Sequence, residues 1–278
     1  MLALLLALAS SVAYGCADFA GGLAARGAHV LRVVAIAAPA SLVLTVALLP
    51  VLGGDFSSPA VGWGAASGVA SAAGFALLYA TLAVGPMSIL SPITALTSGA
   101  LPVVAGLAAG ERLETLGLIG VPLAAAAVVL ISAAPDAGRG RPAAGPLVLA
   151  LAAGTAIAVQ LICLDRAPDD SGVAPLVVGR VVSSALLLLA VAALRGRLGA
   201  RRPDLRLSVL AGVLDALANF AFLLAVREGE LALVGVVTAL YPASTLVLAR
   251  VVLHERLSPP QAAGLGVAAA AVVLLALA

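Results

Sequence analysis

Charge is scarce in this chain of 278 residues, because Asp, Glu, Lys and Arg together make up 10% of it. A soluble domain carries about 25% charged residues, which keep its surface in contact with water. Hydrophobic residues instead make up 63% of the chain, and the mean hydropathy is +1.20. The shortage of charge therefore excludes an ordinary soluble protein.

Lysine is absent, and all 15 basic residues are arginine, which leaves a formal net charge of +2. So small an excess of positive charge argues against nucleic acid as a partner, because phosphate binding needs clustered basic side chains. Histidine and cysteine are also rare, with two of each. Cys16 and Cys163 fall inside apolar segments and are interpreted as packed thiols. We therefore expect no metal site and no cofactor.

Long apolar runs fill most of the chain. A helix needs about 20 apolar residues to cross a hydrocarbon core of roughly 30 Å. The ten predicted spans are Leu2–Ala24, Val30–Leu49, Ala60–Val84, Met87–Ala109, Leu116–Ala134, Pro146–Leu164, Val173–Leu194, Leu207–Val226, Leu231–Leu253 and Ala262–Leu277. The first is interpreted as a transmembrane helix and not a cleaved leader, because no Lys or Arg precedes it. The sequence predicts an all-α, multi-pass protein of the inner (plasma) membrane, surrounded by the lipid bilayer.

Short stretches recur along the chain at a nearly constant offset of 144 residues. The matching pairs are Glu111–Leu113 with Glu255–Leu257, Ala124–Leu130 with Ala268–Leu274, and Thr94–Leu96 with Thr238–Leu240. A repeat of this kind indicates one structural unit used twice. We therefore divide the chain into two five-helix repeats, residues 1–137 and residues 143–278.

Five is an odd number of spans, so the second repeat begins on the opposite side of the membrane from the first. The ten transmembrane helices are therefore expected to form two inverted five-helix repeats. Inverted repeats are the architecture of many alternating-access transporters, whose substrate site lies near the midplane between the halves.

Several short motifs carry a resemblance to a known family. They are Gly110-Glu111-Arg112-Leu113 and His254-Glu255-Arg256-Leu257 before the last span of each half, Tyr14-Gly15 in the first span, Arg32 and Arg180, and Pro102 and Pro242. With ten spans in a five-plus-five repeat, the chain resembles the EamA-like exporters of the drug/metabolite transporter superfamily. It departs from the pattern at Tyr14, where Trp is common, and at His254, where Gly is usual. The resemblance implies a secondary carrier or exporter of small metabolites, amino acids or drugs.

The arginines are distributed unequally between the two sides of the membrane. Odd-numbered loops hold Arg26, Arg32, Arg139, Arg141, Arg195, Arg197, Arg201, Arg202, Arg206 and Arg256, and even-numbered loops hold Arg112, Arg166 and Arg227. The positive-inside rule then predicts that both termini lie outside the cell. The resemblance implies the opposite, with both termini inside.

Asp215 is the sharpest candidate for a functional side chain, because it lies near the middle of span 207–226. A charged side chain at that depth costs roughly 2.5–3.5 kcal/mol on insertion scales. Asn219 follows one turn later on the same helical face. Three interpretations are open. Asp215 is a protonatable site that exchanges a proton for substrate, a structural partner for Arg180, or an acid that faces the lumen and has no coupling role.

Tyr14 and Asp18 lie one turn apart in the first span and share a face. They line the substrate pocket or, as an equal alternative, Asp18 sits at the membrane interface. Arg180 lies about two turns into its span. Snorkelling to the interface explains it nearly as well as contact with a substrate anion does.

Three further residues are candidate pocket groups. Gln160 and Tyr79 could form hydrogen bonds inside the membrane. Tyr241 precedes Pro242, which leaves a carbonyl one turn back without its N–H partner, as is tolerated where that carbonyl faces protein or a cavity. Because Pro102 does the same in the fourth span, we expect kinks at equivalent places in both halves.

A membrane-embedded enzyme or a channel is the alternative class of function. The two histidines, His29 and His254, stand at span ends in separate halves, and neither an H-E-x-x-H motif nor a Gly-rich phosphate loop is present. We therefore expect a transporter and not an enzyme. Its expected partners are a small-molecule substrate and, if Asp215 is protonatable, protons; a monomer and a homodimer fit the sequence equally.

Overall fold

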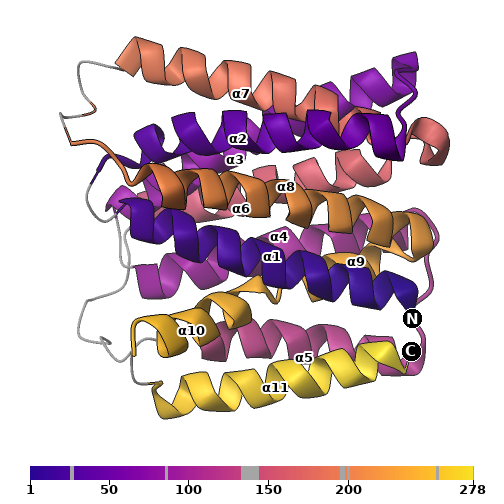
Figure 1. The fold of residues 1–278 in the computed structure, drawn as a ribbon. Helices are drawn as coiled ribbons and strands as arrows, with labels where there is room; N and C mark the ends of the chain where they lie inside the picture. Colours follow the sequence, from indigo (N-terminus) through magenta and orange to yellow (C-terminus); the bar gives the residue numbers. More distant parts are fainter. Residues whose placement is uncertain are drawn as a thin grey trace.

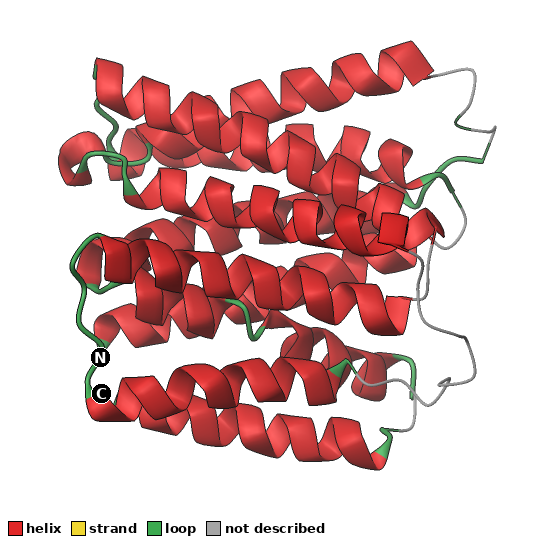
Figure 2. Ribbon diagram, turned by 180° about the vertical axis from the view of Figure 1, so that it is seen from behind, coloured by secondary structure: helices red, strands yellow, loops and turns green. Residues whose placement is uncertain are grey.

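The computed structural model describes residues 1–25, 28–84, 87–132, 144–194, 198, 201–254 and 257–277. These residues form a bundle of helices that run back and forth along one common direction, with both termini at the same edge (Figure 1). The elements are α1 (Leu2–Ala25), α2 (Val30–Leu52), α3 (Ser58–Val84), α4 (Met87–Ala108), α5 (Thr115–Ile131), α6 (Ala144–Asp165), η1 (Asp169–Ser171), α7 (Ala174–Leu194), α8 (Leu205–Glu228), α9 (Leu231–Thr238), α10 (Tyr241–Val252) and α11 (Pro259–Ala276). Figure 2 shows the same bundle from behind, with helix throughout and short connecting loops.

Eight segments of the described chain are long and apolar enough to cross a membrane, and two shorter apolar helices, Ile93–Ala108 and Thr115–Ile131, accompany them. The prediction of an all-α membrane protein is confirmed, and the count is compatible with ten spans. Large apolar side chains such as Val43, Leu118 and Leu189 are exposed on the outside of the bundle. This surface suits lipid, because lipid chains are as apolar as the side chains themselves.

Small residues let the helices approach closely. A Cβ atom added to Gly68 of α3 would lie 2.5 Å from the carbonyl oxygen of Gly179 in α7. Gly64, one turn earlier, meets the carbonyl of Pro175 in the same way at 2.6 Å. In a bilayer such close contacts supply much of the stabilisation, because burial of apolar surface from water contributes little between the helices.

The last helices of the two halves, α5 and α11, pack against each other through reciprocal contacts. A Cβ atom on Gly120 of α5 would lie 2.8 Å from the Leu275 side chain of α11. A Cβ atom on Gly264 of α11 would lie 2.7 Å from the backbone nitrogen of Ile131 in α5. The start of each helix thus meets the end of the other, so α5 and α11 are antiparallel.

Other helices of one half also pack against helices of the other half. Helix α1 packs on α8, and α6 packs on α3. Helix α2 contacts α8, and α7 contacts α3, while α2 and α7 contact each other. No half is therefore a separate bundle, and the centre of the molecule is built from both.

The ninth predicted span, Leu231–Leu253, is broken into α9 and α10, which corrects the expectation of a single helix. Pro242 has no backbone N–H to donate, and the N–H of Leu240 turns back to the carbonyl of Val237 at 3.2 Å. The two halves differ at this point, because α4 continues through Pro102 as one helix. Pro102 instead packs against Gly235 of α9, with 2.6 Å between the proline Cβ and a Cβ built on that glycine.

The first copy of the repeated Glu-Arg-Leu turn lies in the loop between α4 and α5 and contacts the start of α9. The Glu111 carboxylate accepts hydrogen bonds from the backbone N–H groups of Leu231 and Ala232, both at 2.9 Å. These groups begin α9 and have no partner within the helix, and an anion is favoured there by the helix dipole. Of the second copy, Glu255 and Arg256 lie outside the described residues.

The loops at the edge of the termini also contact each other. Gly54, between α2 and α3, forms a bridge with Gly172, between α6 and α7. Arg227 of α8 donates a hydrogen bond to the carbonyl oxygen of Gly172 at 2.7 Å. These contacts stabilise the edge of the bundle where both termini lie, together with the loops that follow α2, α4, α6 and α8 (Figure 1).

Candidate functional site

An ion pair lies inside the bundle, between α7 and α8. The Arg180 guanidinium is 2.8 Å from the Asp215 carboxylate, and the two side chains are only 6% and 14% exposed. Asp215 stands near the middle of α8. Interpreting Arg180 as a snorkelling residue is therefore wrong, because its charge is buried and satisfied by an acid.

Polar side chains extend this pair into a network. The hydroxyl of Ser41 in α2 donates to the Asp215 carboxylate at 3.2 Å. The amide of Asn219 donates to the same carboxylate at 3.2 Å, and its oxygen accepts from Gln160 of α6 at 2.8 Å. Four helices thus hold one connected group of polar side chains, with Ser41 from the first half and the others from the second.

The energetic reason for such a network is the cost of isolated charge in a membrane. A single ionised side chain at the bilayer centre costs roughly 2.5–3.5 kcal/mol on insertion scales. Pairing Arg180 with Asp215 makes the group neutral, and the bonds from Ser41 and Asn219 satisfy more of the carboxylate. Removing one partner of a buried pair costs about 3–5 kcal/mol, because the other charge is left without compensation.

A second group of predicted residues borders this network on α1 and α10. Tyr14 and Asp18 of α1 both lie within electrostatic range of Asp215. Tyr241, at the start of α10, lies within range of Asp18. The hydroxyl of Thr245 donates to the carbonyl of Gly15 at 3.1 Å and fastens the two helices together.

Asp18 differs from Asp215 in its partners. Its side chain is exposed, and within the described part of the chain no hydrogen bond or ion pair holds its carboxylate. Asp18 thus lies within electrostatic range of Asp215, while Arg180 is paired with Asp215.

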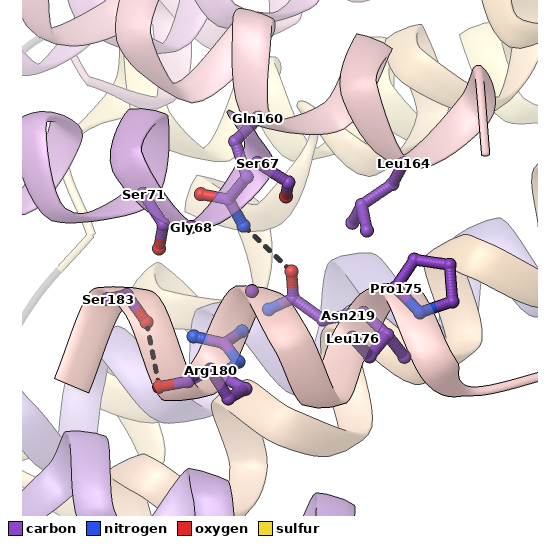
Figure 3. Close-up of a pocket in the computed structure, with 11 residues that line it drawn as sticks. Ser67, Gly68, Ser71, Gln160, Leu164, Pro175, Leu176, Arg180, Ser183 and Asn219 are labelled. Carbon is purple, nitrogen blue, oxygen red and sulfur yellow. Dashed lines mark hydrogen bonds between the residues drawn. The ribbon is translucent and has the colours of Figure 1, made fainter. Parts of the chain in front are cut away.

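A small pocket lies on the other side of Arg180, between α3, α6, α7 and α8 (Figure 3). Its polar lining consists of Ser67, Ser71, Gln160, Arg180, Ser183 and Asn219. The space has room for about one water molecule. The centre therefore leaves little empty space between its polar groups.

Seven of the eight predicted candidates lie in or beside this centre, and their roles in function stay predictions. The eighth, Tyr79, lies on α3, but its side chain is outside the described part of the structure. Sequence reasoning missed Ser41, Ser67 and Ser71. Serine is common in transmembrane helices and carries no signal until packing shows which serines face a charge.

No metal site is formed by the residues that the structure describes, in which no three His, Cys, Asp or Glu side chains gather. The two cysteines are free thiols. The polar centre instead offers hydrogen-bonding groups and an ion pair.

Apolar spans around a buried, charged centre are the features of a multi-pass membrane protein that handles a polar species within the bilayer. Residues 145–277 match the model of the EamA-like transporter family. The resemblance to that family is thereby confirmed over the second half of the chain, and the match supports a membrane transporter in general.

The fold has relatives among solved structures. One of them, titled "Crystal structure of protein", has a TM-score of 0.78 and 16% sequence identity, covering 99% of this chain and 96% of that chain. At this identity the likeness concerns the fold alone. No curated protein matches the chain.

Proposed function

We propose that this chain is a secondary transporter of the plasma membrane, which exports small molecules by alternating access and couples this export to protons. The observation that carries the proposal is the network around Arg180 and Asp215, near the middle of the bundle and shared by both halves. An ionisable group at this depth marks a pathway for substrate, ions or protons in membrane proteins. The family match of residues 145–277 supports the same class.

Alternating access requires two halves that can exchange roles, and we assign these to residues 1–137 and 143–278. The antiparallel packing of α5 on α11 supports the assignment. Gly120 and Gly264 are equivalent positions 144 residues apart, and so are Ile131 and Leu275. Gly120 meets Leu275 and Gly264 meets Ile131, so the two contacts are equivalent. A two-fold axis in the membrane plane relates equivalent helices in this antiparallel manner, which is the arrangement of inverted repeats.

We assign proton coupling to Asp18 and Asp215 acting together. Asp215 is held by Arg180, and Asp18 is exposed within its electrostatic range. A proton on Asp18 would remove one negative charge from the centre and thereby change the field that acts on Asp215 and Tyr14. A cationic group of the substrate would compete with that proton for the same carboxylate, which gives exchange of one for the other.

The experiment that tests the proposal is transport in proteoliposomes with an imposed pH gradient, using a panel of amino acids, amines and organic cations. We expect the gradient to drive uptake or release of at least one class, and Asp18→Asn to abolish the dependence on the gradient. The matched control is Asp55→Asn, which alters an exposed acid in the loop between α2 and α3. Unchanged pH dependence in both Asp18→Asn and Asp215→Asn would refute the coupling, and absence of any flux would refute the transport function.

A further inference from the structure

The pocket beside Arg180 has a chemical character of its own. Arg180 is the one charged residue among the residues that line it. Its guanidinium has five N–H donors, and Asp215 is the one described side chain with which it forms an ion pair. Positive charge and unused donors thus face a small space that contains no acid.

Serine hydroxyls add donors to this space. Ser71 of α3 is 4% exposed, and its hydroxyl has no hydrogen-bond partner among the described residues. Figure 3 shows this hydroxyl turned toward Arg180 across the pocket. Ser67, one turn earlier on the same helix, lines the same space and is also 4% exposed. A buried polar atom without a partner costs free energy. Unlike Ser184, which is also buried without a partner, Ser71 lines an open space in which an occupant can supply that partner.

We propose that this pocket is a subsite for the carboxylate of the transported molecule, bound by Arg180 and Ser71. A carboxylate accepts several hydrogen bonds and pairs well with a planar guanidinium. A cation offers no acceptor to these N–H and O–H donors, whereas a carboxylate offers acceptors for those that Asp215 leaves unused. The identification of the occupant as cargo rests on the proposed transport function.

The size of the pocket sets its role. With room for about one water molecule, it accepts the terminal group of a substrate and not a whole molecule. Gly68 and Gly179 belong to its lining and mark the close crossing of α3 and α7. Separation of these two helices widens the pocket, so carboxylate binding and the movement of the first half against the second are linked.

The wild-type site already contains a competitor, because Asp215 presents its own carboxylate to Arg180. The test therefore uses Asp215→Asn, in which Arg180 has lost that partner. The purified variant is titrated with acetate, and its thermal unfolding is compared with titrations by acetamide and by chloride at constant ionic strength. A ligand that binds the folded state raises its stability in a saturable manner.

Two serine variants give the matched comparison in the same background. Ser71→Ala removes a pocket donor, whereas Ser184→Ala removes a hydroxyl of α7 that is equally buried and also without a partner, but lies outside the pocket. We expect acetate to stabilise Asp215→Asn saturably, and acetamide to have no such effect. Ser71→Ala should weaken acetate binding roughly 2- to 12-fold, the effect of one lost hydrogen bond, and Ser184→Ala should leave it unchanged.

The results that overturn the subsite are equal stabilisation by acetate and acetamide, equal effects of the two serine variants, or no saturable stabilisation by acetate. Should Asp215→Asn not fold, the wild-type protein takes its place, and the same comparison of Ser71→Ala with Ser184→Ala decides. Failure of the transport function gives a different pattern, in which acetate binds but no compound crosses the proteoliposome membrane. Flux without acetate binding refutes the subsite alone.

Discussion

The ion pair between Arg180 and Asp215 gives a prediction with a definite magnitude. Three substitutions test it: Arg180→Gln, Asp215→Asn and the two combined. Because Arg180 is 6% exposed, Asp215→Asn leaves a buried positive charge without compensation, and we expect a loss of about 3–5 kcal/mol in the free energy of unfolding. The double variant removes both charges and should lose much less, since neutral replacement of a buried pair is often harmless.

A neutral bond to the same carboxylate sets the scale for comparison. Ser41 donates to Asp215 at 3.2 Å, and hydrogen bonds between transmembrane helices contribute about 0.6 kcal/mol on average. Ser41→Ala should therefore cost several times less than Asp215→Asn. Reversible unfolding in mixed micelles, followed by the loss of helical circular dichroism, measures all four variants on one scale.

The reasoning is refuted if the double variant is as unstable as the sum of the two single variants. Additive losses would mean that each side chain acts alone and that the 2.8 Å contact does not couple them.

Three further predictions concern packing, capping and orientation. Glu111→Gln should lower stability by about 1 kcal/mol, because it removes the negative charge that caps α9; Glu114→Gln, at a helix start with no side-chain cap bond, is the control with no effect. Gly68→Val should cost about 1–3 kcal/mol or more by overpacking the crossing of α3 with α7. Gly62→Val, on the same helix but with no atom within 4 Å of its added Cβ, should change the unfolding midpoint little. Finally, a cysteine in place of exposed Arg202, in a background without the native cysteines, should react with a membrane-impermeant maleimide in inside-out vesicles and not in intact cells, as the positive-inside rule requires. Labelling of intact cells would reverse the assigned orientation.

Much of the fold follows from the length and composition of the apolar runs. Every predicted span contains helix, because a backbone inside a bilayer must satisfy its own hydrogen bonds. The break in the ninth span was signalled by Pro242, but its extent was not, since proline alone can also be accommodated in a continuous helix. Pro102 in α4 is such a case, and the difference arises from the packing of each helix against its neighbours.

The central network was only partly accessible from the sequence. The pairing of Asp215 with Asn219 follows from helical spacing, and Arg180 as a partner of the acid was one of the interpretations that the sequence left open. The bond between Gln160 and Asn219 joins helices 59 residues apart in the chain, and no local pattern determines such a contact. Likewise, the repeated Glu-Arg-Leu turn was visible as a motif, but the bonds of Glu111 to α9 depend on the tertiary fold.

The broken ninth span has a mechanical consequence. Seven of the eight residues of α9 are buried, whereas α10 has no buried residue. Helix α10 is held to α1 by the bond from Thr245 to Gly15, so it would move with α1 and not with α9. At 1.5 Å per residue, the twelve residues of α10 form a lever about 18 Å long. A rotation of about 15° at residues 239–240 would displace the far end of that lever by about 5 Å while α9 and its Glu111 cap remain in place. The pivot is only two residues long, and the helix beyond it is about as long as half of a hydrocarbon core roughly 30 Å thick.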